Sequence, residues 1–239
     1  MSSYIITHKQ FDLPIPQYKK EQYKVICPKG TTIENWPNII YFDSSLDNTL
    51  WDELAAMDWI ARNDNDEWIT INHYRRILEP MPGVISHAQQ VYFPTNLGQQ
   101  YAEYHNVMDL HIISNIIKQI YPNFYNLWLY TLQSNIFYPY NIVSFPNPTY
   151  KDYMGKIMTV LSTYLNAIGV KTKDDMLNRI KSNVAYTTPN GKRNIDVEYQ
   201  SRVLGFLAER LTSWYINILY STRQYQIQTC HVNKYDGAW

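Results

Sequence analysis

The sequence predicts a single α/β domain with a mostly parallel central sheet and a helical C-terminal half. Three observations carry this prediction. Short apolar runs bounded by turn residues surround one helical pattern in the first half of the chain, and the order strand, helix, strand is typical of parallel sheets with crossover helices. Two long amphipathic patterns occupy much of the second half. No internal repeat or long linker divides the 239 residues, so we expect one domain with halves at about 1–95 and 96–239.

The strands follow from short apolar runs that end at polar or turn-forming residues. Residues 4–6 form the first such run, and the run at residues 68–71 is the most strand-like in the first half. Pro139 interrupts a candidate strand at residues 136–145. The other predicted strands are residues 23–27, 39–42 and 91–93.

The helices follow from apolar residues that recur every three to four positions. In residues 49–63, Leu50, Leu54 and Met57 show this spacing, and Asp47 or Asn48 can cap the helix. Tyr121 and Pro122 end the next helix. The remaining predicted helices are residues 105–120, 151–168, 173–181 and 197–220.

The overall charge argues against partners that are held mainly by electrostatic attraction. The chain has 21 basic and 21 acidic side chains and a pI near 7.0, so neither duplex DNA nor an anionic membrane surface is expected as a partner. The 22 Tyr, 7 Trp and 7 Phe residues fit two interpretations: binding of sugars or bases, or an apolar core rich in Tyr.

The two cysteines indicate a reducing compartment. Cys27 and Cys230 lie near opposite ends of the sequence, without the spacing of a zinc site or of a disulfide framework. We find neither a signal peptide nor an apolar run of the ~18 residues that a membrane span requires. We therefore expect a cytoplasmic protein without a membrane span.

Two polar clusters follow predicted strands, where ligands bind in open α/β sheets. The first is Thr7, His8 and Lys9 after residues 4–6. The second follows residues 68–71 and comprises Asn72, His73, Tyr74, Arg75 and Arg76. Adjacent arginines beside His and Tyr suit a diphosphate, because each guanidinium is always charged and donates in a planar fork. The alternatives are an ordinary surface ion pair for the arginines and a structural role for His8.

Three carboxylates are candidates for acid–base chemistry. Glu53 lies at the edge of the apolar stripe of its helix, Asp109 occupies a similar place near the start of another, and Glu209 precedes Arg210 on the strongest helix. The alternative for each is a charge on a helix surface. Residues 64–66 form an Asp-Asn-Asp triplet that we interpret as a hydrophilic turn rather than a metal site. The motifs of dinucleotide folds, P-loops, zinc proteases and serine hydrolases are absent from the sequence.

Six short motifs follow one another along the chain. They are Thr7-His8-Lys9, Glu53 with Ala56 and Trp59, His73-Tyr74-Arg75-Arg76, His105 with Asp109, Tyr138-Pro139-Tyr140-Asn141, and Glu209-Arg210-Leu211. In this order they resemble the bacterial capsular and exopolysaccharide glycosyltransferases long catalogued only as a domain of unknown function. The resemblance extends from residue 4 to about residue 215. Asp52 stands where that family usually has Cys, and Asp58 with Trp59 replaces its Tyr-Trp pair.

The resemblance implies a cytoplasmic transferase with a Rossmann-like GT-A fold that uses a nucleotide-diphosphate sugar, expected to be UDP-linked, and a glycan acceptor. The sugar expected is a hexose such as galactose or galactofuranose. Residues 1–95 then form the nucleotide-binding half and residues 96–239 the acceptor half. The implied donor-binding residues are Thr7, His8, Lys9, Asn48, Glu53, His73, Tyr74, Arg75 and Arg76; the acceptor residues are Tyr138, Tyr140, Asn141 and Arg210; the candidate bases are Asp109 and Glu209.

GT-A enzymes usually hold a metal on the diphosphate with an Asp-x-Asp motif after the central strand. Here that position offers His73-Tyr74-Arg75-Arg76, so our hypothesis is that the arginines replace the metal. No cofactor is firmly implied, and a divalent metal such as Mn²⁺ or Mg²⁺ is left open. Two alternatives also stay open: a sugar-binding protein without transfer activity, and a transferase acting on modified nucleic acid through the basic segment 171–192. The donor sugar, the acceptor, the stereochemical outcome and the oligomeric state are open as well.

Overall fold

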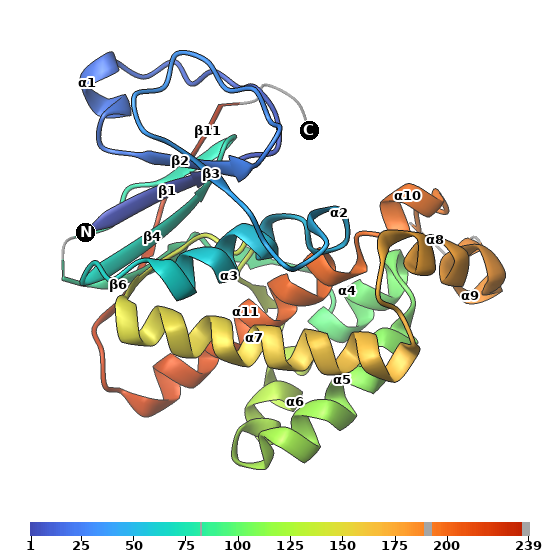
Figure 1. Cartoon of the computed structure of the whole chain (residues 1–239). Coiled ribbons are helices and arrows are strands. Elements are labelled where there is room, and N and C mark those ends of the chain that lie inside the picture. Colours follow the sequence, from blue (N-terminus) through green and yellow to red (C-terminus); the bar gives the residue numbers. More distant parts are fainter. Residues whose placement is uncertain (82, 189–192, 236–239) are drawn as a thin grey trace.

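The computed structural model describes residues 1–239 except 82, 189–192 and 236–239. Within the described residues, nine strands form one sheet in the order β10-β6-β9-β4-β1-β2-β3, with β5 joining β4 to β11. The sheet lies above a layer of helices, and an arm carrying α8, α9 and α10 projects to one side (Figure 1). The end of the basic segment 171–192 therefore lies outside the described residues.

The strands β3, β2, β1 and β4 pair in parallel, β9 runs antiparallel to both β4 and β6, and β10 pairs in parallel with β6. A second, two-stranded sheet pairs β7 with β8. The strands are β1 (Ser2–Ile6), β2 (Lys24–Pro28), β3 (Ile39–Phe42), β4 (Trp68–His73), β5 (Arg76–Leu78), β6 (Ile85–Ala88), β7 (Val91–Tyr92), β8 (Ile136–Phe137), β9 (Val143–Pro146), β10 (Ile227–Cys230) and β11 (Val232–Lys234).

Most helices belong to the second half of the chain. The helices are α1 (Gln17–Lys20), α2 (Asn48–Trp51), α3 (Glu53–Asn63), α4 (Leu97–Tyr104), α5 (Val107–Ile120), the 3₁₀ turn η1 (Pro122–Phe124), α6 (Tyr125–Gln133), α7 (Asn147–Ile168), α8 (Lys173–Ser182), α9 (Val184–Thr187), α10 (Val197–Gln200) and α11 (Val203–Thr222). The prediction of an α/β fold with a mostly parallel sheet and a helical second half is confirmed.

The register of β1 brings the two predicted polar clusters to one edge of the sheet. β1 pairs in parallel with β2 and with β4, and Ile6 lies opposite both Ile26 and His73. The residues that follow β1 and β4 are therefore neighbours at the carboxyl ends of the strands. This is the edge at which open α/β sheets bind ligands.

Alternate residues of β1 and β2 pack into two separate cores. Ile6 and Ile26 face the helices α3, α7 and α11, whereas Ile5 and Val25 face the loops between residues 8 and 38. Most large aromatic side chains are part of the helical core, so the core interpretation holds for them. Those with less than 2% exposure include Trp128, Trp214, Tyr101, Tyr150, Tyr153, Tyr164 and Tyr186.

Cys27 and Cys230 are both buried and both free thiols. Burial raises the pKa of the Cys27 thiol to about 11, which makes it a weak nucleophile near neutral pH. No described helix is long and apolar enough to cross a membrane.

Two helices predicted as continuous are interrupted. The helix predicted at residues 49–63 breaks at Asp52, whose φ of 46° separates α2 from α3. The helix predicted at residues 197–220 breaks after Gln200, so Arg202 lies between α10 and α11. The candidate strand at residues 136–145 also divides, because Tyr140 and Asn141 both have positive φ. Strands β5, β6, β10 and β11 and helices α4 and α6 were not anticipated from the periodicity.

Candidate functional site

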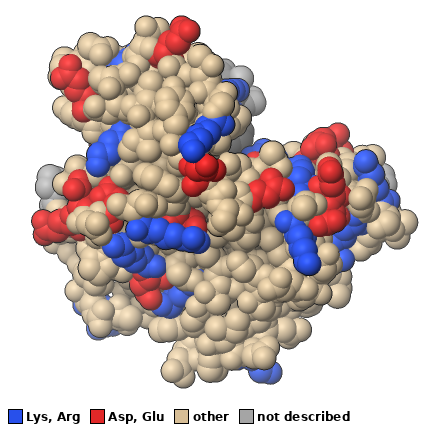
Figure 2. Space-filling model, viewed as in Figure 1, with Lys and Arg blue, Asp and Glu red and all other residues tan. Residues whose placement is uncertain are grey.

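A small pocket of about 70 Å³ lies at the carboxyl ends of the parallel strands. Its lining residues come from the carboxyl ends of β1 to β4 and from α2 and α3. Figure 1 shows α2 next to the ends of these strands, and Figure 2 shows a notch between the upper lobe and the arm that projects to one side. Charged side chains of both signs gather along this notch (Figure 2). The residues lining the pocket are Ile6, Thr7, His8, Pro28, Phe42, Asn48, Asp52, Glu53, Ala56 and His73.

The loop after β1 places Thr7 and His8 in the pocket wall and Lys9 outside it. The Thr7 hydroxyl donates to the Lys9 carbonyl at 2.7 Å, and the Lys9 amide donates back to the hydroxyl oxygen at 3.2 Å. This local turn holds the loop in place. The Lys9 ammonium lies 5.4 Å from the centre of the Tyr74 ring, which is buried in the core beside Phe11. Burial lowers the pKa of His8, and the nearby Lys9 charge lowers it further.

His73 is the member of the second cluster that lines the pocket. Its Nδ1 accepts a hydrogen bond from the Arg75 amide at 3.3 Å. Burial, together with the charges of Arg75 and Arg76, lowers the pKa of His73 to about 3, so the imidazole is neutral near pH 7. The Arg75 guanidinium lies 5.1 Å from the Tyr74 ring, and that of Arg76 lies 4.3 Å from the Tyr140 ring. The two arginines thus supply positive potential beside the pocket.

Asn48 and Asp52 approach the pocket from α2. The Asn48 side-chain oxygen is buried and accepts no hydrogen bond from any residue that the structure describes. A buried amide oxygen without a donor costs free energy, typically about 1–3 kcal/mol, unless a ligand or water satisfies it. Burial raises the pKa of Asp52, against the lowering effect of Arg202. Asn48 was anticipated as a donor-binding residue; Asp52 was noted only as a departure from the family pattern.

Glu53 and Glu209 hold the left-handed turn at Tyr140 and Asn141. Glu53 Oε1 accepts a hydrogen bond from Asn141 Nδ2 at 2.8 Å, and Glu209 Oε1 accepts one from the Tyr140 amide at 3.0 Å. On its other side, the Asn141 oxygen accepts from the Thr212 hydroxyl at 2.6 Å. Glu53 is thus tied to the turn after β8 through Asn141.

The raised pKa of Glu53 predicts that the free energy of unfolding depends on pH. Burial, with the negative charge of Glu209 and against the Asn141 hydrogen bond, raises this pKa from 4.5 to about 7. Between these values the folded protein binds more protons at Glu53 than the unfolded chain does, so its contribution to stability is lost as the pH rises from about 4.5 to about 7. In the wild type this effect should lower the free energy of unfolding by up to about 3 kcal/mol over that pH range, and Glu53→Gln should remove it. Urea unfolding at several pH values measures the difference.

Glu198→Gln is a suitable control for that measurement, because the Glu198 side chain is 71% exposed. It should leave the pH profile of unfolding unchanged. If Glu53→Gln and the wild-type protein show the same pH dependence, Glu53 is ionised normally in the folded state.

Asp109, Arg210 and Tyr138 lie away from the pocket lining. The Asp109 side chain has no exposed surface and accepts hydrogen bonds from the hydroxyls of Tyr101, Tyr164 and Tyr186. Arg210 is buried beneath Glu209, where its Nη1 lies 3.4 Å from Glu209 Oε2 and its guanidinium lies 4.8 Å from the Phe137 ring. Burial lowers the pKa of Arg210.

Tyr138 packs against the ring of His87 with the centroids 4.7 Å apart. Its amide donates to the Ser213 hydroxyl at 3.1 Å. Among the predicted acceptor residues, the structure therefore brings Tyr140 and Asn141 next to Glu53 and Glu209. Tyr138 instead contacts His87 and Ser213, and Arg210 contacts Glu209.

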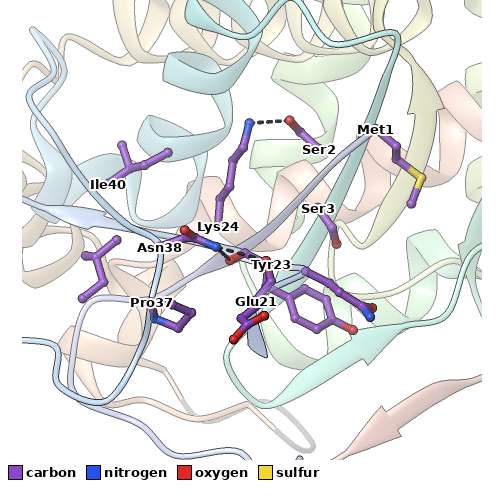
Figure 3. Close-up of a pocket in the computed structure, with 11 residues that line it drawn as sticks. Met1, Ser2, Ser3, Glu21, Tyr23, Lys24, Pro37, Asn38 and Ile40 are labelled. Atoms are coloured by element: carbon purple, nitrogen blue, oxygen red, sulfur yellow. Dashed lines mark hydrogen bonds between the residues drawn. The ribbon is translucent and has the colours of Figure 1, made fainter. Parts of the chain in front are cut away.

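A larger hollow of about 580 Å³ lies at the opposite, amino-terminal end of β1 to β3. Its polar side chains bond to one another: Lys24 Nζ donates to the Ser2 hydroxyl at 2.6 Å, and Asn38 donates to the Glu21 carbonyl at 3.0 Å (Figure 3). Asp64 and Asp66 lie next to Lys24, with carboxylate oxygens 3.8 and 4.0 Å from its Nζ. Because these groups satisfy one another, the smaller pocket at the carboxyl ends is the better candidate site.

The Asp-Asn-Asp triplet is engaged in structural hydrogen bonds. Asp64 accepts from the Tyr4 hydroxyl at 2.5 Å, and its other oxygen accepts from the Asp66 amide at 2.7 Å. Across residues 1–81, 83–188 and 193–235, no three His, Cys, Asp or Glu side chains are arranged to hold a metal ion.

Sequence reasoning did not anticipate Arg202 as part of this region. Its guanidinium nitrogen Nε lies 3.8 Å from Asp52 Oδ2. It is separated from Asp52 by 150 positions and sits inside an uninterrupted helical pattern, so no local signal marked it.

Comparison with known proteins adds to this geometry. The family described as a domain of unknown function (DUF4422) matches residues 77–187, which is less than half of the chain. The apo structure of WbbM, a bifunctional glycosyltransferase, is similar with a TM-score of 0.70 and 16% sequence identity. The match covers 99% of this chain and 45% of the WbbM chain. No curated protein matches. The chain thus shares a GT-A-like α/β fold with part of that protein and spans just under half of its length.

Proposed function

We propose that this chain is a glycosyltransferase that moves a hexose, such as galactose or galactofuranose, from a UDP-linked donor to a glycan acceptor in polysaccharide or surface-glycan synthesis. One observation carries this proposal. The pocket at the carboxyl ends of the parallel strands combines the buried Asn48 oxygen, which has no hydrogen-bond donor among the described residues, with the neutral imidazole of His73 and the carboxyl groups of Asp52 and Glu53. Such an arrangement suits a ligand rich in hydroxyl groups. The GT-A-like fold supports the same assignment.

The donor is proposed to lie with its nucleoside near Thr7 and His8 and its diphosphate toward Arg75 and Arg76. Support comes from the positive potential that both arginines place beside His73. Positive groups aimed at a leaving diphosphate stabilise the charge that develops on it during transfer. In this proposal the arginines take the role that a metal ion has in other GT-A enzymes.

Nucleotide binding tests this proposal directly. We expect UDP, at about 100 times its dissociation constant, to raise the melting temperature by about 5 to 10 °C. Arg75→Ala should weaken UDP binding roughly tenfold, because a charge-assisted hydrogen bond contributes about 1.5–3 kcal/mol. EDTA should leave both binding and transfer unchanged.

Arg62→Ala is the matched control, since Arg62 is 61% exposed and pairs with Asp58 at the far end of α3. It should not alter UDP binding. Full dependence of transfer on manganese would contradict the role given to the arginines. Binding of free sugars without any response to UDP, GDP or CMP would instead identify a sugar-binding protein of the same fold.

A further inference from the structure

The backbone at Asp52 is held in a conformation that side chains rarely adopt. Its φ of 46° and ψ of −129° lie in a region that favours glycine. Asp52 occupies the capping position before α3, yet its side chain accepts no hydrogen bond from the first turn of that helix. An Asp at this position normally stabilises a helix by about 1 kcal/mol through such a bond. Asp52 therefore has both a strained backbone and no capping hydrogen bond, and its carboxylate lines the pocket rather than capping α3.

The partner of Asp52 comes from the other end of the chain. Arg202 lies at the break between α10 and α11, and its Nε is 3.8 Å from Asp52 Oδ2. The side chains of Asp52 and Arg202 are 41% and 59% exposed, so this ion pair is weak and easily exchanged. Because Asp52 lines the pocket, this contact places the Arg202 guanidinium beside the pocket.

A diphosphate would compete with Asp52 for the Arg202 guanidinium. The present contact joins single atoms at 3.8 Å, longer than a hydrogen bond. Phosphate oxygens accept two parallel N–H bonds from one guanidinium and carry more negative charge than a carboxylate. The Arg202 guanidinium would therefore form stronger hydrogen bonds with the ligand than it forms with Asp52.

We propose that Arg202 is a donor-binding residue that pairs with Asp52 while the pocket is empty and moves to the diphosphate when a nucleoside diphosphate binds. This inference rests on the proposed function, because it requires a nucleoside-diphosphate ligand. Asp52 keeps the guanidinium beside the pocket and neutralises it until the ligand arrives. The strained backbone at Asp52 directs its carboxylate toward Arg202 and away from the first turn of α3.

Calorimetric binding of UDP and of uridine to four proteins tests the exchange. Arg202→Ala should bind UDP about tenfold more weakly than the wild type. The UDP affinity of Arg202→Lys should lie between those two, because Lys keeps the charge but lacks the planar guanidinium. Asp52→Asn should bind UDP about threefold more tightly, because it removes the competing carboxylate. None of these changes should alter the affinity for uridine, which lacks phosphates.

The control variants are Arg62→Ala and Asp58→Asn, which break an ion pair outside the pocket and should leave UDP binding unchanged; the Arg62 side chain is 61% exposed, similar to the 59% of Arg202. Equal weakening of UDP and uridine by Arg202→Ala would overturn the inference and indicate that Arg202 only shapes the pocket. Unchanged or weaker UDP binding by Asp52→Asn would also overturn it. A wild-type protein that binds no UDP, GDP or CDP would instead refute the proposed function.

Discussion

Replacing Asp109 with alanine is expected to destabilise the protein by about 3–5 kcal/mol, a large fraction of the stability of an ordinary domain. The carboxylate accepts hydrogen bonds from the hydroxyls of Tyr186 at 2.6 Å, Tyr164 at 2.7 Å and Tyr101 at 3.4 Å. These tyrosines come from α9, α7 and α4, so one buried side chain on α5 connects four helices. Its removal leaves three buried hydroxyls without their acceptor.

The measurement is the urea midpoint of Asp109→Ala, with Asp174→Ala as the control. Asp174 also lies in the first turn of a helix but is exposed, so its loss should cost less than about 1 kcal/mol. Asp109→Asn should be milder than alanine, because the amide keeps an acceptor oxygen of the same size. Similar midpoints for Asp109→Ala and Asp174→Ala would show that the tyrosine cluster contributes little.

The same experiment separates two roles for Asp109. The sequence pattern made Asp109 a candidate general base, whereas the structure surrounds it with tyrosines away from the pocket. If the role of Asp109 is structural, the folded Asp109→Asn variant should transfer sugar at nearly the wild-type rate. A folded Asp109→Asn protein with turnover reduced by more than about 100-fold would restore its assignment as a base.

Local patterns predicted the strands well because those strands are simple apolar runs. Residues 4–6 and 68–71 appear within β1 and β4, which pair at the centre of the sheet. The helix breaks were missed for a physical reason. At Asp52 and Arg202 the apolar spacing continues, and only contacts with distant parts of the chain decide that the backbone turns there.

The candidate site was predicted in part. Thr7, His8, Asn48, Glu53 and His73 do meet in one pocket, because strand ends that are far apart in sequence share an edge of the sheet. The hydrogen bond between Glu53 and Asn141 spans 88 positions, and no local pattern contains it.

Replacing Glu209 with glutamine is expected to reduce turnover by about 10²- to 10⁴-fold, the usual contribution of a general base. Glu209 is the predicted base that the structure places near the pocket. It faces Glu53 across the turn at Tyr140 and Asn141, and its side chain is 22% exposed. We propose that its carboxylate accepts the proton of the attacking acceptor hydroxyl.

Glutamine is an informative replacement because it removes the base while keeping the contact that holds the turn. Its side-chain oxygen can still accept the Tyr140 amide hydrogen that Glu209 accepts at 3.0 Å. The UDP affinity of Glu209→Gln should therefore stay close to that of the wild type, whereas its melting temperature should fall, because the buried Arg210 loses the carboxylate charge beside it. Glu198→Gln, an exposed change on the neighbouring helix α10, should leave turnover unaffected. If Glu209→Gln transfers sugar within about threefold of the wild-type rate, Glu209 positions the turn and another group accepts the proton.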